Sequence, residues 1–316
     1  MAKNLVWVKM EYYKIILEPQ SPFSQLFTAD QVWGQIIWAI NYLYGEEEAT
    51  NLVSLFEYDP PFLVSSMIPY GYLPNPILPP NRQNCVGKNE KEVEARKKAK
   101  KIKKQEWLSL KRFSEVQNDI NSIYNDEPEL FSVDLNKITE IHATIDRLQN
   151  KTLQNGLYNS QYITSNSKFV IYLCLKRDFK FWMDKFIEIL EYLEKTHLGG
   201  DRNIGRGYFK IKLKELNELE TKIFECKNCN KVMTISRCFG SNIKPFSYRV
   251  SVYAGITGNN GNSNFSALNK KPIIYLENGS ILDEGIGNIA HPVSRNSKIC
   301  SYGYVFPIPI NYKENF

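Results

Sequence analysis

The segment that most constrains the fold is 168–176 (KFVIYLCLK), which is apolar on both of its faces. A strand of this kind is expected at the centre of a sheet. Downstream, apolar residues recur at helical spacing over 179–195, and Asp178 is available as the helix cap. An alternating strand follows at 208–213. These segments predict a strand, a helix and another strand in succession.

A similar set of elements is predicted nearer the beginning of the chain. Residues 11–18 (EYYKIILE) predict a strand, and 62–68 (FLVSSMI) predict another. Between them, a helix is expected to begin at a cap formed by Thr28 or Asp30 and to end at Gly45. The order is therefore β-α-β, an insertion, and β-α-β. This is the ferredoxin-like pattern, an antiparallel sheet with two helices on one face.

The length of 316 residues is about twice that of a usual single domain, which favours two domains or a large insertion. Residues 69–80 (PYGYLPNPILPP) contain five prolines, which forbid regular structure there. We therefore predict an α+β protein. Its first domain spans 1–216 with an insertion at about 72–160, and a smaller second domain at 217–316 is rich in short strands separated by Asn- and Gly-rich loops.

The positive charge of the chain is local. The formal net charge is +6, yet residues 86–112 alone hold eleven Lys and Arg against four Glu, a net +7. The rest of the chain is therefore close to neutral, at about −1. The basic helix expected at 91–104 suits a phosphate backbone or an acidic protein, and the alternative is a solvated helix or linker.

Cysteine and histidine are too sparse to predict a metal or redox centre. Cys226 and Cys229 form half of a zinc ribbon, with Cys238 nearby and Cys300 or His291 as a possible fourth ligand, but a second paired set is missing. Ordinary reduced thiols are the alternative. The sequence has no apolar run of about 18 residues and no signal-peptide pattern, so we expect a cytoplasmic protein that does not enter the membrane.

Residues 199–207 (GGDRNIGRG) form a glycine-rich loop that joins a helix to a strand, whereas nucleotide-binding phosphate loops join a strand to a helix. A dinucleotide site is therefore rejected. Glycines allow backbone N–H groups to approach an anion, and Arg202 and Arg206 add charge, so the loop suits a nucleic-acid backbone. A glycine helix cap followed by a bend is the alternative.

Residues 141–162 combine charges, amides and an aromatic ring, which is the mixture that single-stranded RNA recognition requires. The candidates are His142, Arg147, Lys151 and Tyr158. His142 as a general base is the alternative, but no second histidine and no lysine–tyrosine set stands beside it. Further along, His291 and Arg295 lie in a loop where they could meet phosphate or a base, or form a surface pair.

Taken together, these segments resemble the RAMP subunits of the Cas five group in type III-A CRISPR effector (Csm) complexes. The resemblance rests on the order of SPFSQLFTADQVWGQI, LPNPILPP with the lysine-rich helix after it, IDRLQNKTLQNGLY, GGDRNIGRGYF and AHPVSR. It spans most of the chain. The combination is specific, although each piece alone is weak.

The resemblance implies two ferredoxin-like (RRM-like, RAMP) domains and no nuclease activity. We expect no cofactor and assign no residue to a metal. The resemblance also implies a subunit that caps the 5′ repeat-derived handle of the crRNA, between the large polymerase/cyclase-like subunit and the first backbone RAMP subunit, and that meets target RNA only indirectly. A RAMP endoribonuclease that processes precursor crRNA is one alternative, and a protein-interaction adaptor whose basic helix binds an acidic partner without RNA is another.

The same resemblance assigns roles to individual residues. The loop at 24–31 and the glycine loop hold the handle, residues 142–158 form a thumb-like hairpin at the handle/guide junction, and the last loop lines the same groove. The RNA-binding residues implied in this way are Ser24, Phe27, Thr28, Gln31, His142, Arg147, Lys151, Tyr158, Gly200, Arg202, Gly205, Arg206, Gly207, His291 and Arg295.

Overall fold

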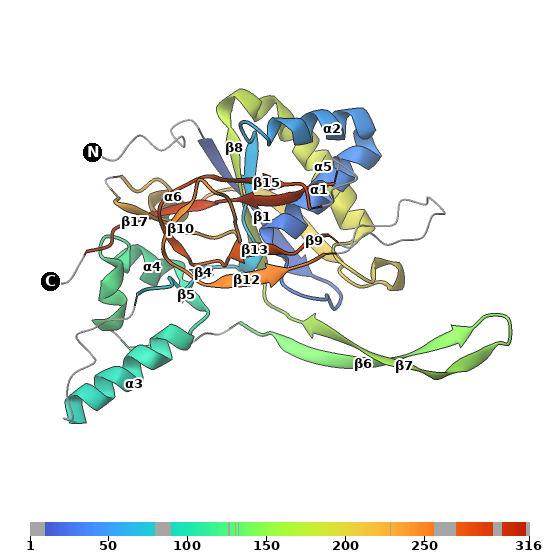
Figure 1. The fold of residues 1–316 in the computed structure, drawn as a ribbon, viewed down its shortest axis with the longest axis horizontal. Coiled ribbons are helices and arrows are strands. Elements are labelled where there is room, and N and C mark those ends of the chain that lie inside the picture. Colours follow the sequence, from blue (N-terminus) through green and yellow to red (C-terminus); the bar gives the residue numbers. More distant parts are fainter. Residues whose placement is uncertain are drawn as a thin grey trace.

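The computed structural model describes residues 10–79, 90–125, 127–129, 131, 133–227, 229–255, 270–292 and 299–313. Two antiparallel sheets and the helices beside them form the body, and a long two-stranded hairpin extends from it (Figure 1). The protein is thus of mixed α and β structure, as the sequence predicted.

The first sheet has the strand order β2-β8-β1-β9, formed by β2 (Phe62–Val64), β8 (Phe169–Lys176), β1 (Met10–Pro19) and β9 (Phe209–Glu215). All but the last residue of β8 are buried, which confirms the prediction of a central strand. The segment expected as a strand over 62–68 is divided, because β3 (Ile68–Pro69) pairs separately with β8. The prediction that residues 69–80 contain no regular structure is wrong in part, because β4 (Tyr72–Pro74) pairs with β5 (Trp107–Ser109).

Helices α1 (Ala29–Tyr44), α2 (Glu46–Leu55) and α5 (Met183–Thr196) lie together beside the first sheet (Figure 1). The N–H of Thr28 donates to Oε1 of Gln31 at 3.1 Å, and Gly45 ends α1 with a φ of +93°, so both predicted boundaries of this helix are confirmed. The start of the helix predicted at 179–195 differs from the prediction. The segment Arg177–Trp182 is a 3₁₀ helix, η3, and the α-helix begins only at Met183.

The C-terminal half forms the second sheet, with the order β11-β14-β10-β17. Its strands are β10 (Lys231–Thr234), β11 (Lys244–Ser247), β14 (Ile281–Glu284) and β17 (Pro307–Ile310). Two ribbons lie beside it: β12 (Val250–Tyr253) with β13 (Ile273–Leu276), and β15 (Gly287–Ala290) with β16 (Ser301–Tyr304). Helix α6 (Glu218–Phe224) precedes β10, and the described residues from β10 to β17 contain no helix.

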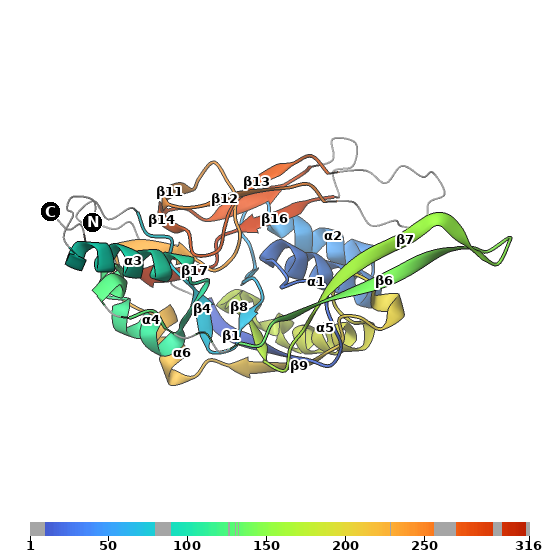
Figure 2. The ribbon, with the colours of Figure 1, turned by 90° about the horizontal axis from the view of Figure 1, so that it is seen from below.

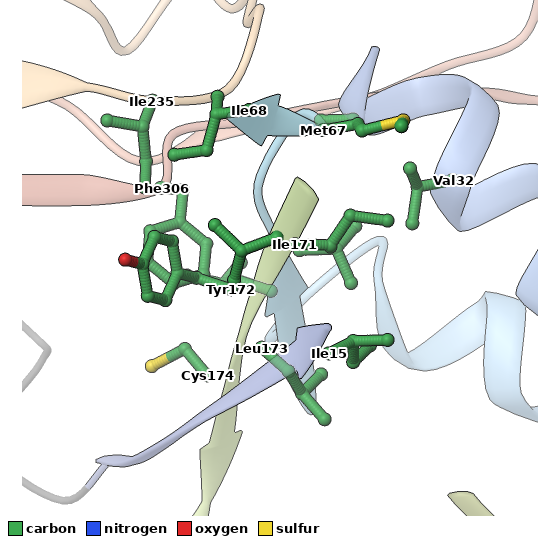
Figure 3. Close-up of a cluster of buried hydrophobic side chains, with 14 of the residues drawn as sticks. Ile15, Val32, Met67, Ile68, Ile171, Tyr172, Leu173, Cys174, Ile235 and Phe306 are labelled. Atoms are coloured by element: carbon green, nitrogen blue, oxygen red, sulfur yellow. The ribbon is translucent and has the colours of Figure 1, made fainter. Parts of the chain in front are cut away.

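The two halves share one hydrophobic core. Ile235 and Phe306 of the second half lie beside Ile68 and Tyr172 of the first, and all four are buried (Figure 3). Hydrogen bonds cross the same boundary: the hydroxyl of Tyr302 accepts the N–H of Val64 at 3.2 Å, and the N–H of Ser66 donates to the carbonyl of Ile235 at 3.1 Å. The halves are therefore expected to unfold together.

An ion pair adds to this junction. The guanidinium of Arg237 donates through Nε and Nη2 to the two carboxylate oxygens of Asp30, in the first turn of α1. The side chains of Arg237 and Asp30 are only 11% and 10% exposed. The rings of Tyr253 and Tyr275 lie against the guanidinium, with centroids at 4.4 and 4.5 Å from its central carbon.

The insertion between β4 and β8 carries two features at opposite ends of the molecule. The basic helix α3 (Glu90–Lys104) lies at one end, and the hairpin of β6 (Asn136–Asp146) and β7 (Lys151–Thr164) extends at the other (Figures 1 and 2). Buried Ile102 anchors α3, and Lys98 pairs with Glu127 at 3.0 Å. Helix α4 (Leu110–Val116) and the 3₁₀ helix η2 (Ile120–Asn125) complete the insertion.

Arg237→Ala is expected to lower the free energy of unfolding by about 3 kcal/mol, because the carboxylate of Asp30 then stays buried without its counter-charge. Urea unfolding followed by circular dichroism measures this loss. Lys244→Ala is the matched control, since its ion pair with Glu284 is exposed and its removal is expected to leave the midpoint almost unchanged. Equal midpoint shifts for the two variants would show that the buried pair does not join the halves.

Candidate nucleic-acid interface

The hairpin is attached to the body through the loop that follows β1. The N–H of Phe23 donates to the carbonyl of Ile163 at 3.0 Å, and the N–H of Ile163 donates back to the carbonyl of Phe23 at 2.7 Å. Phe23 itself is fully buried against Phe169 and Phe209 of the first sheet. The base of the hairpin is thus held firmly, while its outer part extends away from the body (Figure 2).

The two faces of the hairpin differ in chemistry. His142 lies opposite Tyr158 in the register, and Glu140 and Tyr162 share that face because side chains alternate along each strand. The other face presents Ile141 and Leu157, which are 73% and 68% exposed. One face is therefore aromatic and charged, and the other exposes apolar side chains among polar ones such as Thr139 and Asn159.

On the aromatic face, the rings of His142 and Tyr158 stack with centroids 5.3 Å apart and planes 22° apart. Tyr158 is 53% exposed, so one side of this pair faces solvent. Nearer the base, Tyr162 is buried and its hydroxyl donates to Oδ2 of Asp201 at 2.9 Å. Burial, with this hydrogen bond, raises the pKa of Tyr162, so its phenol stays neutral at physiological pH.

Arg206 connects the glycine loop to the hairpin. Its Nη2 donates to both carboxylate oxygens of Glu140, at 2.6 and 2.5 Å, and its guanidinium carbon lies 4.9 Å from the centroid of the Tyr162 ring. The sequence grouped Arg206 with Arg202 as a pair of phosphate-binding charges. The structure instead gives Arg206 an internal partner, which suits a residue that positions the hairpin.

Arg202 is different. It lies in the short 3₁₀ helix η4 (Arg202–Ile204) of the glycine loop, its side chain is exposed, and it has no ion pair among the described residues. Gly200 and Gly205 nearby have no other atom within 4 Å of the position a Cβ would take, so a ligand can approach the loop closely there, although the N–H of Gly205 already donates to the carbonyl of Arg202 at 3.0 Å. This part of the loop retains the features that suit a phosphate.

Two glycines of the loop are required by the path of the chain. Gly199 and Gly207 have φ values of +86° and +71°. A Cβ on Gly207 would lie 1.8 Å from the carbonyl oxygen of Leu198, and one on Gly199 would lie 2.7 Å from the ring of Phe27. Gly207 is therefore a structural requirement of the loop and is buried.

The segment at 24–31 lies against the glycine loop. Phe27 is buried beneath Gly199, and the N–H of Gly199 donates to Oε1 of Gln35 in α1 at 3.0 Å. Ser24 is exposed, while Thr28 and Gln31 begin α1 and are half-buried. Phe27 therefore supports the surface from below.

Of the remaining predicted residues, Arg147, Lys151 and His291 take no part in these contacts. Arg147 and Lys151 are exposed at the tip of the hairpin, beyond the His142–Tyr158 pair. His291 follows β15, and its Nε2 lies 3.3 Å from Oε1 of Glu57. Arg295 lies outside the described residues.

Several residues of the site were not predicted from the sequence. Glu140 and Tyr162 complete the aromatic face, and Asp201 accepts from Tyr162. His197 stacks on Tyr208 beside the glycine loop, with centroids 5.1 Å apart. The alternation of residues 140, 142, 158 and 162 identifies them only once the register of the hairpin is known.

The described cysteines do not come together as a metal centre. The Sγ atoms of Cys226 and Cys229 are 2.9 Å apart, whereas Cys238 is buried and its backbone pairs with Leu276. Within the described ranges, no three His, Cys, Asp or Glu side chains are grouped as ligands for a metal ion. Among those residues there is also no helix long and apolar enough to cross a membrane.

The family model of the RAMP superfamily matches residues 26–210, which include strands β2 and β8 of the first sheet, the helices beside it, the hairpin and the glycine loop. This chain belongs to the RAMP superfamily.

Within that superfamily, the chain is similar along almost its whole length to the CRISPR system Cms protein Csm4 of Thermococcus onnurineus. The two are 21% identical over 310 residues, which cover 96% of this chain and 98% of that protein. A shorter match, 36% identical over 80 residues, links 24% of this chain to 32% of the CRISPR system Cms endoribonuclease Csm3 of Methanocaldococcus jannaschii.

Solved structures show the same fold. A chain in the crystal structure of a Csm1–Csm4 cassette in complex with pppApA matches 96% of this chain, with 99% of its own length covered, a TM-score of 0.63 and 17% identity. A chain of the Csm3–Csm4 subcomplex in the type III-A CRISPR-Cas interference complex matches 95% of this chain and 99% of its own length, with a TM-score of 0.63 and 18% identity.

Arg206→Ala is expected to loosen the hairpin, because Glu140 loses both of its charge-assisted hydrogen bonds. Amide hydrogen exchange over 136–164 should become about tenfold faster, the factor that corresponds to about 1.4 kcal/mol. Arg202→Ala is the matched control and should leave exchange in the hairpin unchanged. Equal exchange rates in the wild-type and Arg206→Ala proteins would show that Arg206 does not position the hairpin.

Proposed function

We propose that this chain is the crRNA-binding, non-catalytic subunit of a type III-A CRISPR interference complex, and that it caps the 5′ repeat-derived handle of the crRNA. The proposal includes two RAMP domains of ferredoxin-like type and contacts with a large polymerase/cyclase-like subunit and a backbone RAMP subunit. It requires no cofactor. The observation that carries it is the aromatic and charged face of the hairpin beside the glycine loop.

The chemistry of this face suits a single-stranded RNA. A base can stack on the exposed side of Tyr158, which His142 supports from behind. A phosphate can bind the exposed guanidinium of Arg202 and approach the backbone closely at Gly200, where no side chain stands in the way. Base platform and phosphate site belong to one region, because Arg206 and Tyr162 join the hairpin to the glycine loop.

The relatives support the assembly. The names of the matched structures place Csm4 with Csm1 in one complex and with Csm3 in another. A protein of the same fold and nearly the same length is expected to have two protein neighbours. The basic helix α3 lies away from the hairpin, with Lys97, Lys100 and Lys101 exposed, and suits general attraction of RNA or contact with such a neighbour (Figure 1).

The geometry around His142 does not favour catalysis. Its Nε2 is enclosed by protein and lies 3.8 Å from Oε2 of Glu140, so it does not point toward an accessible substrate site. The other two histidines have different contacts, since His197 stacks on Tyr208 and His291 meets Glu57. Among the described residues neither of these histidines contacts His142, and the carboxylate of Glu140 beside it is already paired with Arg206.

Arg202→Ala is expected to weaken binding of a handle-bearing crRNA by about tenfold, because one charge-assisted phosphate contact is lost. The dependence of log Kd on log salt should become shallower by about one unit. Fluorescence anisotropy across a salt titration measures both effects. Lys214→Ala removes an exposed charge from the far end of β9 and is expected to change neither; equal effects of the two variants would contradict a specific phosphate site.

Endoribonuclease activity is the second candidate, since the short Csm3 match comes from a protein named as an endoribonuclease. We expect the purified chain to leave a repeat-containing RNA intact over hours, with or without divalent metal. Cleavage at one position of the repeat that disappears in His142→Ala would support this candidate and contradict the proposal. Cleavage that survives in His142→Ala is assigned to a contaminating nuclease.

A further inference from the structure

The outer face of helices α1 and α5 carries a row of three aromatic rings. Trp38 and Tyr42 are one helical turn apart on α1, with ring centroids separated by 5.8 Å. The ring of Tyr42 stacks on Tyr192 of α5 at 6.1 Å. Trp38 is 42% exposed and Tyr42 is 65% exposed. We call these three residues the aromatic row.

The aromatic row is not required for the core. The opposite side of α1 already packs inward through Trp33, Ile36 and Ile40, which are almost fully buried. Large aromatic side chains left exposed together lose favourable burial, whereas scattered ones are ordinary on a surface. Exposed Trp and Tyr are also the residues that dominate the binding energy of protein interfaces.

The charge around the aromatic row is negative. Helices α1, α2 and α5 together hold eight carboxylate residues against two lysines, Lys185 and Lys195, a net −6 in a chain whose total is +6. Some of these groups have internal partners: Asp30 pairs with Arg237, Lys185 pairs with Glu48 at 2.6 Å, and one carboxylate oxygen of Glu188 accepts from the hydroxyl of Tyr44 at 2.5 Å. Glu188 and Glu191 lie on α5 close to Tyr192, and both are exposed.

The negative charge of this face favours a protein over RNA as its binding partner. A polyphosphate chain would be repelled by an acidic face, so the aromatic row is not a continuation of the base platform on the hairpin. A guanidinium, in contrast, can stack on Tyr or Trp and pair with a neighbouring carboxylate. The face thus offers two complementary contacts to a basic protein surface.

We infer that the aromatic row with Glu188 and Glu191 is a docking surface for a protein subunit that presents Arg or Lys side chains among aliphatic ones. The identification of that subunit as a neighbour in the interference complex rests on the proposed function. The surface is distinct from the glycine loop and the hairpin, so assembly and RNA binding use separate side chains.

The test co-expresses the tagged chain with the large subunit, the backbone subunit and the crRNA of the same interference complex, and measures what is recovered on the tag. Trp38→Ala/Tyr42→Ala and Glu188→Lys/Glu191→Lys are each expected to reduce recovery of one protein subunit at least tenfold. Binding of crRNA by the isolated variants should stay within about twofold of wild type. Tyr248→Ala, which removes an exposed ring from the other half of the chain, is the matched control. It should change neither the recovery of the protein subunits nor the binding of crRNA.

Each substituted side chain is exposed or half-exposed, and melting temperatures close to that of the wild type verify that the variants fold. Full recovery of both subunits with folded variants would overturn the docking surface. A selective loss of RNA affinity in the isolated variants would also overturn it, because the face would then bind nucleic acid. Failure of the wild-type chain to recover either subunit would instead contradict the proposed function itself.

Discussion

The burial of helix α1 is the constraint on which the candidate interface depends. One side of α1 packs on the first sheet and α5, while Trp33 stacks on Tyr302 of β16 and Asp30 pairs with Arg237. The N-terminal end of α1 is thereby fixed. Because the loop before α1 contacts both the glycine loop and the base of the hairpin, this packing places two segments that are far apart in the sequence at one site.

The charges at this site divide into those that build it and one that is open to a ligand. Arg206 pairs with Glu140, Tyr162 donates to Asp201, and these two contacts hold the hairpin on the glycine loop. Arg202 stays exposed on the same loop. A pre-positioned surface of this kind loses less conformational entropy when it binds RNA than one whose side chains must first be ordered.

Local sequence signals predicted the elements well. The uniform apolar run of β8, the Thr28 cap and Gly45 end of α1, and the charge of α3 all depend on neighbouring residues, and each is confirmed. The pairing of Arg206 with Glu140 joins residues 66 positions apart and depends on the register of the hairpin, which no local pattern specifies. The shared core and the Arg237–Asp30 pair were missed for the same reason, as both join the two halves.

The central claim is that RNA contacts the hairpin and the glycine loop together. Photo-crosslinking with 4-thiouridine in the repeat-derived segment of the crRNA, followed by mass spectrometry, measures this most directly. The account predicts crosslinked peptides from 140–162, including Tyr158, and from 197–208, with none from the acidic face of α1 and α5. Crosslinks confined to the basic helix α3 would contradict it, because binding would then be general electrostatic attraction at the other end of the molecule.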